Sequence, residues 1–388
     1  MEANKAKNIV IITSGYFPEG DAGAVRLFYN AKALTESGYS VRVLCRGKAN
    51  DRGCIEGIDY QSLRTKNGNR ILKFIDYKSF PSKVKEQLKT AGEISYVYIY
   101  NAPMSVFQFC KGFCKDRNIP LIHDCVEWYS PDEFKLGKLD KAYRSKNKLN
   151  TKVIDKSFSV IAISSFLENH FKGKGIHTLR LPILCDGQKC APQKNNGERL
   201  TLFYAGLPFR KDYIGNLLRG ALLLSEEEQK RLRIVLVGAT REYLIRSSDI
   251  PEQVLDRCTP FLQLKGRVPR TEVLALMEEA DFTVLPRDAS RRYAQAGFPS
   301  KVVESLSNAT PILCNYSSDL ELYLHDGNNA LIAENHTPEA LAETIRKALL
   351  LTPEEKSQMS KNARESAKEY FDYRNYSGAL DAFFQSAK

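Results

Sequence analysis

The feature that most constrains this chain is a regular alternation of short apolar runs with helix-like segments, which stops once and then restarts. Before residue 185 the apolar runs are NIVIIT, SVRVLC, SYVYIY, PLIHDC, SVIAIS and HTLRLPI. They are rich in Val, Ile and Tyr and are bounded by turns, which is typical of β-strands. Helical patterns such as RLFYNAKALTESG, with a final glycine suited to a C-cap, lie between several of them. The alternation predicts a parallel sheet covered by helices on both faces.

The alternation is interrupted at residues 185–200, CDGQKCAPQKNNGERL, which are polar and lack periodicity. It restarts with TLFYAG, RIVLVG, FLQLKG, FTVLP, TPILC and ALIAEN. We therefore expect two doubly wound α/β domains, residues 1–185 and 186–370, facing each other across a cleft. The helical residues 371–388 are expected to return to the first domain. Open parallel sheets bind ligands at the carboxyl ends of their strands, so site residues should directly follow strands.

Composition and charge limit the classes of partner. Hydrophobic residues make up 43% and charged residues 27% of the 388 positions, as in ordinary soluble proteins. The first apolar run, NIVIIT, is too short for the core of a signal peptide, and no run approaches about 18 apolar residues, so we expect a cytoplasmic protein. The net charge of +11 favours anionic partners: nucleic acid, an acidic membrane face or a phosphorylated substrate. No nucleic-acid module is recognisable, so we expect no nucleic-acid partner, whereas contact with the inner face of an anionic membrane fits the charge.

The cysteines do not form a framework for a metal or for disulfides. Nine are scattered without a Cys-x-x-Cys pair, and Cys110 and Cys114 have no further ligands at suitable spacing. We expect reduced, buried thiols and no bound metal.

The segment AGFPSKVVESL, after the predicted strand FTVLP, has the composition of an anion-binding helix start. Ser300 is the predicted N-cap, and first-turn amides, the helix dipole and Lys301 would attract a diphosphate. Gly297 allows close backbone approach, and Pro299 fixes the turn. Glu304, on the first turn, can accept hydrogen bonds from two sugar hydroxyls. An ordinary capped helix with Glu304 near its N-terminus explains the same residues.

Two more elements of the second half follow predicted strands. Arg210 and Lys211 lie between strand and helix in FYAGLPFRKDYIGNLL, where they either contact an anion or are solvated loop charges. In LKGRVPRTEVLALMEEADF, the backbone around Arg267 could contact a nucleobase edge while Val268 packs on its face. A simple helix-entry turn, capped by Thr271, is the alternative for this loop.

In the first half, the loop SGYFPEGDAGAVR joins the first strand to the first helix. Its glycines, including Gly23, do not match the Gly-x-Gly-x-x-Gly spacing of dinucleotide-binding folds. Such a loop can close over a phosphate or a second substrate, and Arg26 is placed to reach it.

The segment LIHDCVEWYSPDEF brings an imidazole and carboxylates together at a predicted strand end. His123, Asp124 and Glu127 are therefore candidates for acid–base or sugar-binding roles. A histidine satisfied within the core is the alternative.

The ordered set of motifs resembles the retaining, nucleotide-sugar-dependent glycosyltransferases of family 4, which have the GT-B architecture. The resemblance covers nearly the whole chain and rests on YFPEGDAGAVR, AKALTESGYSVRVL, VIAISSFLENHF, LFYAGLPFRKDYIGNLL, IVLVG, KGRVPRTEVLALMEEADFTVLP, AGFPSKVVESLSNATPIL and ELYLHDGNNALIA. Each motif is loose by itself, whereas their order is specific.

The resemblance implies roles for individual positions. Glu304 is similar to the second of two family glutamates eight positions apart, which holds the ribose, while Ala296 occupies the position of the first. Lys211 is similar to the phosphate-binding lysine. Leu207 replaces the family's arginine, and Arg210 is the expected substitute. His123 and Asp124 fall where the family has a sugar-facing residue. The other positions assigned to substrate binding are Gly206, Gly238 and the diphosphate turn Gly297, Phe298, Pro299, Ser300 and Lys301.

The resemblance implies transfer from a nucleotide sugar with retention at the anomeric carbon. No Asp-x-Asp occurs in the sequence, so we expect no metal or other cofactor, with cations and a helix terminus stabilising the diphosphate instead. Expected acceptors are a glycan or a polyprenyl-diphosphate-linked saccharide in capsule, exopolysaccharide or lipopolysaccharide synthesis.

Three alternatives stay open. Ala296 and Leu207 favour a non-catalytic nucleotide- or polyanion-binding protein. The acidic residues at 123–133 keep a nucleotide-sugar epimerase possible. An NAD-dependent oxidoreductase is disfavoured because the glycine fingerprint is absent.

Overall fold

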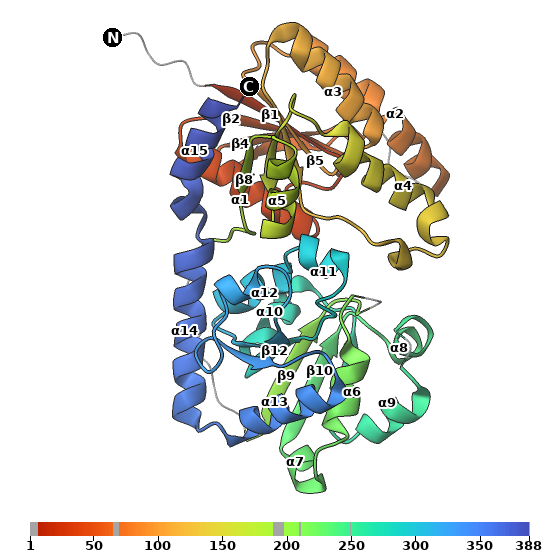
Figure 1. Cartoon of the computed structure of the whole chain (residues 1–388), viewed down its shortest axis with the longest axis vertical. Coiled ribbons are helices and arrows are strands. Elements are labelled where there is room, and N and C mark those ends of the chain that lie inside the picture. Colours follow the sequence, from red (N-terminus) through yellow and green to blue (C-terminus); the bar gives the residue numbers. More distant parts are fainter. Residues whose placement is uncertain (1–6, 65–69, 189–197, 209–210, 249, 388) are drawn as a thin grey trace. The chain divides into compact units, whose positions relative to one another are not determined.

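The computed structural model describes residues 7–64, 70–188, 198–208, 211–248 and 250–387, and the chain divides into two units (Figure 1). Unit 1 comprises residues 1–185 and 372–388, and unit 2 comprises residues 186–371. Most of the predicted connecting segment, and Arg210, lie outside the described residues.

Unit 1 is built on an eight-stranded sheet in the order β3-β4-β2-β1-β5-β6-β7-β8. Neighbouring strands are parallel except for the antiparallel pair β3–β4. The strands are β1 (Asn8–Thr13), β2 (Ser40–Cys45), β3 (Arg52–Ile55), β4 (Ile58–Ser62), β5 (Tyr96–Tyr100), β6 (Leu121–Cys125), β7 (Ser159–Ala162) and β8 (Thr178–Arg180).

The central strands of unit 1 are buried because helices cover both of their faces. Every residue of β5, β6 and β7 is buried, and Ile9 of β1 pairs with Val41 of β2 and Tyr96 of β5. Strands that are buried on both faces are expected in parallel sheets.

The helices of unit 1 lie on the two sides of this sheet, with α2 and α3 opposite α1 and α15 (Figure 1). The C-terminal helix α15 packs on α1 and the strands, with Phe383 and Phe384 in the same core cluster as Leu27 and Ile9. The helices are α1 (Ala22–Glu36), α2 (Arg70–Thr90), α3 (Met104–Arg117), α4 (Lys141–Lys148), α5 (Ser165–Gly173) and α15 (Ser377–Ser386), with short turns η1 (Pro131–Glu133), η2 (Gly137–Leu139), η3 (Leu149–Val153, a π-helical turn) and η5 (Tyr373–Tyr376).

The hairpin β3–β4 was not predicted from the sequence. Its connection is the pair Glu56 and Gly57, with φ of 47° and 81°. Two consecutive positive φ angles make the tight turn that suits a right-twisted hairpin. Glutamate is an uncommon residue at the first of these positions, so the turn carries a weak sequence signal.

Unit 2 is built on a six-stranded parallel sheet in the order β11-β10-β9-β12-β13-β14. Counted along the unit this is the order 3-2-1-4-5-6 of nucleotide-binding doubly wound sheets. The strands are β9 (Leu200–Ala205), β10 (Leu232–Val237), β11 (Leu262–Gly266), β12 (Phe282–Leu285), β13 (Ile312–Asn315) and β14 (Ala330–Ala333).

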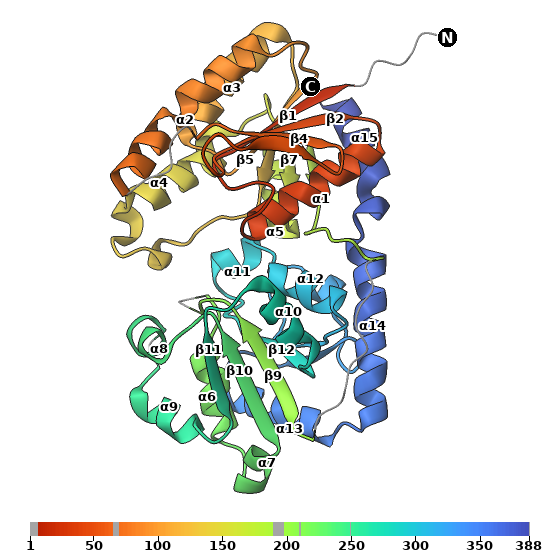
Figure 2. The ribbon, with the colours of Figure 1, turned by 180° about the vertical axis from the view of Figure 1, so that it is seen from behind.

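The helices of unit 2 also cover both faces of the sheet, and Figure 2 shows α10 and α12 on the face opposite α6 and α13. Leu217 of α6 and Ile345 of α13 pack in one core cluster, whereas Met277 of α10 packs with Phe203 and Val235 in another. The helices are α6 (Ile214–Ala221), α7 (Glu226–Lys230), α8 (Arg241–Ser247), α9 (Glu252–Cys258), α10 (Arg270–Glu278), α11 (Arg292–Ala296), α12 (Ser300–Ser307), α13 (Pro338–Leu350) and α14 (Pro353–Phe371), with η4 (Leu320–Leu322).

The predicted fold class is confirmed, since every apolar run named from the sequence contains a strand and both sheets are doubly wound. In each sheet the strand order reverses at one point, between β1 and β5 and between β9 and β12. Ligands of such sheets bind outside the carboxyl ends of the strands at this point. Each unit should therefore have its site there. Every helix in the described part of the chain is too short or too polar to cross a membrane.

Candidate functional site

Unit 1 contains a cavity of about 360 Å³ at the reversal point of its sheet. The cavity is lined by Thr13 and Gly15 at the end of β1, Tyr100 and Asn101 at the end of β5, and the segment 123–127 at the end of β6. The N-terminal turn of α1, the side chains of Tyr129 and Lys146, and Asn150 complete the wall. The structure therefore brings Gly23, His123, Asp124 and Glu127 to one cavity.

His123 is the buried histidine of this wall, with 4% of its surface exposed. Its Nδ1 lies 3.4 Å from the carbonyl oxygen of Ile99, and its ring meets Phe107 edge-on at 5.0 Å. Within the described residues its Nε2 atom is buried without a hydrogen-bond partner. Burial lowers the pKa of His123 to about 4, against an opposing effect of Asp124. The imidazole is thus neutral near pH 7 and suited to hydrogen-bond a hydroxyl rather than to supply a proton.

The buried neutral histidine predicts a specific pH dependence of stability. The pKa of His123 is about 4 in the folded chain, whereas its ordinary value is 6.5. As the pH falls from 6.5 to 4, the unfolded chain binds a proton that the folded chain does not, so the free energy of unfolding decreases by about 3 kcal/mol from this residue. Above pH 6.5 the residue contributes no such loss.

Urea unfolding at several pH values tests this prediction. In the wild type, His123 should lower the free energy of unfolding between pH 6.5 and 4.5 by at most about 1.4 kcal/mol per pH unit. His123→Gln should lack this contribution, so its free energy of unfolding should decrease less over the same range. His325→Gln, at an exposed histidine of unit 2, is the control. An identical pH profile for His123→Gln and the wild type would show that the imidazole is protonated in the folded chain.

Asp124 and Arg26 form a buried ion pair, which corrects two sequence predictions. The guanidinium of Arg26 donates from Nε to Oδ2 at 2.9 Å and from Nη2 to Oδ1 at 2.8 Å, and Tyr98 donates its hydroxyl to Oδ2 at 2.7 Å. Arg26 also donates to the carbonyl oxygen of Pro182 at 2.9 Å. Burial lowers the pKa of Arg26, but the adjacent carboxylate outweighs it and the net shift is upward. The expectation that Arg26 reaches a ligand is therefore wrong, because its charge is consumed inside the unit.

The same contacts make Asp124 a positioning residue rather than a base. Both of its oxygens accept hydrogen bonds from buried donors, and the residue is 1% exposed. A carboxylate held in this way fixes the neighbouring backbone of β6, which carries His123 and pairs with β5. The prediction that Asp124 acts directly on substrate does not fit these contacts.

The rim of the cavity carries polar groups suited to a sugar. The Tyr129 hydroxyl donates to Glu127, and Lys146 donates from Nζ to the side chain of Asn101 at 3.1 Å. Position 23 has no room for a side chain, because a Cβ there would lie 2.7 Å from the hydroxyl oxygen of Tyr100. The glycine thus keeps the start of α1 against the cavity wall.

Unit 2 has a charged cluster at the reversal point of its own sheet, centred on Asp212. Lys301 donates from Nζ to Oδ2 at 3.1 Å, and Arg287 donates from Nε to Oδ1 at 2.7 Å. The Tyr204 hydroxyl donates to Oδ2 at 2.8 Å, and Lys301 Nζ lies 5.0 Å from the centre of that ring. Burial raises the pKa of Asp212, but Arg287 and Lys301 outweigh it and hold the pKa well below its usual range. The cluster of two cations and one carboxylate therefore keeps a net positive charge.

Glycines shape the backbone around this cluster. Gly206, directly after β9, has a φ of 137°, and a Cβ there would lie 3.2 Å from Cε of Lys301. Gly238, after β10, has a φ of 100°, and a Cβ there would lie 2.8 Å from the carbonyl oxygen of Gly206. Both positions need glycine for conformation and space. Their role is to let the strand ends and the lysine stem pack together.

The start of α12 differs in detail from the prediction. Ser300 is the first helical residue rather than the N-cap, because Pro299 precedes it with φ −75° and ψ 117° and takes the N-cap position. Gly297 has an extended φ of −91°, which any residue can adopt. Phe298 is buried against Tyr323 and Phe371, so its side chain supports the turn rather than a ligand.

Glu304 lies in the second turn of α12 rather than the first. Its Oε1 is 3.4 Å from Nη2 of Arg270, the first residue of α10. This half-exposed pair links α12 to the loop that contains Arg267, which is exposed. Val268 of that loop leans on the core cluster of Phe203 and Val235, so only part of its surface is open to a base.

Lys211 lies beside the Asp212 cluster. Its Nζ is 5.6 Å from the centre of the Tyr293 ring, and its carbonyl oxygen accepts a hydrogen bond from the Tyr293 hydroxyl at 3.0 Å. Leu207 is exposed, and Ala296 is fully buried, so a glutamate at position 296 would bury a carboxylate in this structure. The structure thus brings Lys211, Gly206 and Lys301 into one region of unit 2.

Asp212 and Arg287 are the site residues that the sequence analysis missed. Arg287 directly follows β12 and its Pro286, and its backbone N–H donates to Oδ1 of Asn315 at 2.9 Å. The position of Arg287 in the sequence could have identified it. It is a charged residue at the end of β12, the strand beside β9, where the strand order of the sheet reverses.

The described part of the chain has no cluster of side chains suited to bind a metal ion. No group of three or more His, Cys, Asp or Glu side chains there is placed to hold a metal ion. The cysteines of the described residues form no disulfide with one another, and all but Cys54 are buried. Burial raises the pKa of Cys45 to about 11 and that of Cys125 to about 12, so both are protonated thiols.

A known protein family matches the second half of the chain. Residues 188–366 match the model of the family described as "Glycosyl transferases group 1". No curated protein matches the chain.

Solved structures share the fold over nearly the whole chain. Sucrose-phosphate synthase from Thermosynechococcus elongatus has 16% identity and a TM-score of 0.73, covering 98% of each chain. WaaG, a glycosyltransferase involved in lipopolysaccharide biosynthesis, has 17% identity and a TM-score of 0.67, covering 97% of this chain and 99% of its own. Anabaena HepE, solved with UDP and glucose, has 13% identity and a TM-score of 0.68, covering 98% of this chain and 100% of its own. The chain therefore has the GT-B fold.

Proposed function

We propose that this protein is a glycosyltransferase that moves a sugar from a nucleotide-sugar donor to a glycan or lipid-linked acceptor, with retention at the anomeric carbon. The observation that carries this proposal is the cluster of Lys301, Arg287 and Asp212 at the carboxyl ends of β9 and β12. It lies in the part of the chain that matches the group 1 family. Positive charge at this point of a doubly wound sheet suits a diphosphate.

The donor would be held by unit 2 in three parts. Lys301 and the first-turn amides of α12 would bind the diphosphate, with Lys211 and Arg287 adding positive charge. Glu304 would accept hydrogen bonds from the ribose hydroxyls, exchanging its long contact with Arg270 for them. The loop at Arg267 and Val268 would contact the base. Arg210, which lies outside the described residues, keeps its predicted role as a further cation.

The cations would also assist the chemistry. Breaking the sugar–phosphate bond places additional negative charge on the diphosphate, and fixed positive groups stabilise that charge most when it has fully developed. Lys301 and Arg287 are held in place by Asp212 before any ligand binds, so little reorganisation is needed. We propose that these side chains serve where other transferases use a metal ion. The leaving phosphate would then accept the proton of the acceptor hydroxyl.

The cavity of unit 1 would take a sugar of the reaction. His123 lines that cavity, and its neutral imidazole would hydrogen-bond a sugar hydroxyl through Nε2, which has no partner among the described residues, while Glu127 and Lys146 supply further polar groups. We assign the product to surface polysaccharide synthesis, capsule or lipopolysaccharide, at the inner face of an anionic membrane. Support comes from the basic charge of +11 and from the likeness to WaaG.

A two-step experiment tests the proposal. Thermal-shift screening of nucleotide sugars identifies the donor that stabilises the chain most. Release of free nucleotide from that donor is then measured with and without lipid-linked saccharide acceptors and with EDTA. We expect release that requires acceptor and is unaffected by EDTA. A conversion of the donor sugar without acceptor would indicate an epimerase, and binding without any turnover would indicate a non-catalytic nucleotide-binding protein.

Glu304→Ala provides the residue-level test of the ribose assignment. Loss of two hydrogen bonds to a carboxylate should weaken donor binding by about 10- to 100-fold, seen as a raised KM. Glu343→Ala removes a carboxylate from another ion pair of unit 2, with Arg346, and should leave KM unchanged. Equal KM values for Glu304→Ala and the wild type would refute the assignment.

A further inference from the structure

The segment from Phe134 to Lys152 carries much of the positive charge of unit 1. It contains seven lysines and arginines and a single acidic residue, Asp140. Asp140 is the N-cap of α4, and its carboxylate accepts hydrogen bonds from the backbone of Ala142 and Tyr143. The segment is one continuous surface, because η2 and η3 both pack on α4. We call it the 134–152 surface.

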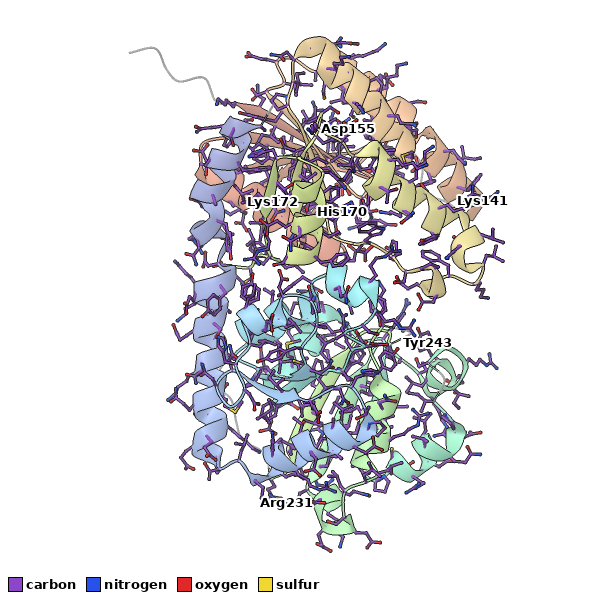
Figure 3. The ribbon with its side chains drawn as sticks, viewed as in Figure 1. Lys141, Asp155, His170, Lys172, Arg231 and Tyr243 are labelled. Atoms are coloured by element: carbon purple, nitrogen blue, oxygen red, sulfur yellow. The ribbon has the colours of Figure 1, made fainter. Side chains whose placement is uncertain are left out.

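The cations of this surface are concentrated on its outer side. Lys141, Arg144 and Lys148 recur at the spacing of one face of α4, and all three are exposed. Lys135, Lys138 and Lys152 are also exposed, and within the described residues none of these six cations pairs with a carboxylate. Figure 3 labels Lys141 at the outer edge of unit 1. The charge therefore faces solvent rather than internal partners.

Two large apolar side chains project from the same surface. Leu136 is 67% exposed and Leu139 is 76% exposed, on either side of Gly137, whose φ of 53° suits glycine. Both leucine side chains therefore meet solvent over most of their surface. Together with the cations they make the combination of a basic face and apolar anchors that binds membrane interfaces.

The inner side of α4 belongs to the cavity described above. Lys146, on the cavity wall, contacts Asn101, and Asn147 accepts a hydrogen bond from the indole of Trp128 at 3.0 Å. The Phe134 ring packs near Tyr143, with 6.1 Å between ring centres. One short helix thus joins the basic surface to a wall of the cavity.

We propose that the 134–152 surface docks on an anionic lipid bilayer, with Leu136 and Leu139 inserted among the lipids and the cations on the headgroups. This deepens the membrane contact of the proposed function by assigning it to named residues. The leucines favour a bilayer over a soluble polyanion, which would use the charges alone. Docking here holds the cavity of unit 1 close to a lipid-linked saccharide.

Vesicle binding of the full chain, without donor or acceptor, tests the inference. We expect binding to phosphatidylcholine vesicles with about 30% phosphatidylglycerol and none to phosphatidylcholine alone. Each cation near such a surface contributes about fivefold, so Lys138→Glu, Lys141→Glu and Arg144→Glu combined should lower the partition coefficient by at least about 100-fold. Leu136→Ser with Leu139→Ser should lower it by about 10-fold or more.

Controls separate this surface from net charge and from a polyanion site. Arg257→Glu, Lys347→Glu and Lys361→Glu combined make the same charge change at exposed positions of unit 2 and should keep binding within about threefold. Binding to heparin should be insensitive to the leucine variant. Vesicle binding that is unchanged in the leucine variant, or equally weakened in the unit 2 control, would overturn the inference.

The outcome is independent of glycosyl transfer. Nucleoside diphosphate binding, which is assigned to unit 2, reports that each variant is folded. Vesicle binding that depends on Leu136 and Leu139 in a protein without turnover would support the surface and contradict only the enzymatic proposal.

Discussion

Replacing Lys301 by alanine is expected to lower kcat/KM for the nucleotide-sugar donor by about 100- to 1000-fold, the usual effect of removing one preorganised group that stabilises developing charge. The lysine is held at 3.1 Å from Asp212 and passes over Gly206, which has no side chain to obstruct it. Because charge on the diphosphate increases as the bond breaks, most of the loss should appear in kcat rather than in KM. Steady-state kinetics with the donor found by screening measures both.

Lys356→Ala is the matched control for this prediction. Lys356 forms an ion pair with Asp281, which also belongs to unit 2. As in the pair of Lys301 with Asp212, the carboxylate is buried, but neither residue of this pair belongs to α12. It should retain kcat within about twofold. Equal losses in the two variants would show that removing any such lysine disturbs unit 2, and the assignment of Lys301 would fail.

Replacing Arg26 by alanine is expected to lower the free energy of unfolding by about 3–5 kcal/mol, because the carboxylate of Asp124 stays buried without its partner. The guanidinium supplies two hydrogen bonds to that carboxylate and one to the carbonyl of Pro182. Urea unfolding monitored by a probe in unit 1 measures the loss. Nucleoside diphosphate binding at unit 2 should be unaffected under conditions where the variant is folded.

A double variant tests whether the pair, rather than Arg26 alone, matters. Arg26→Ala combined with Asp124→Ala removes both charges and should be more stable than Arg26→Ala by about 1–3 kcal/mol. Lys111→Ala, from the half-exposed pair with Asp155, should cost less than about 1 kcal/mol. Besides Arg26, the Asp124 carboxylate accepts hydrogen bonds from Tyr98 at 2.7 Å and from the side-chain amide of Asn30 at 3.4 Å. If the double variant is less stable than Arg26→Ala, these two donors suffice to stabilise the carboxylate, and the proposed energetics are wrong.

The fold was predictable from the sequence because buried parallel strands leave a strong pattern. Every residue of strands β5, β6 and β7 is buried, and each strand appears in the sequence as a short, mostly apolar run between turns, although β6 also contains His123 and Asp124. The hairpin β3–β4 escaped notice because β3 is largely exposed and its turn uses Glu56. Half-exposed edge strands carry little apolar signal.

The candidate sites were predictable only in outline. Strand ends identified segments that the structure brings together, because topology alone places the carboxyl ends of parallel strands at one edge of each sheet. The partners within each region depend on contacts between distant residues: Asp212 meets Arg287 and Lys301 across 75 and 89 positions. Likewise, nothing in the local sequence tells that Arg26 turns inward to Asp124. The sequence shows which charged residues follow strands. The direction in which each side chain points, and the residue with which it pairs, are known only from the structure.

Calorimetric titration of the full chain with UDP, GDP and ADP and with the matching monophosphates tests the central claim most directly. One diphosphate is predicted to bind at least about 10-fold more tightly than its monophosphate, and Lys301→Ala should remove most of this preference. A chain that binds no nucleotide, or a diphosphate preference that persists in Lys301→Ala, would contradict the claim that unit 2 holds a diphosphate at α12.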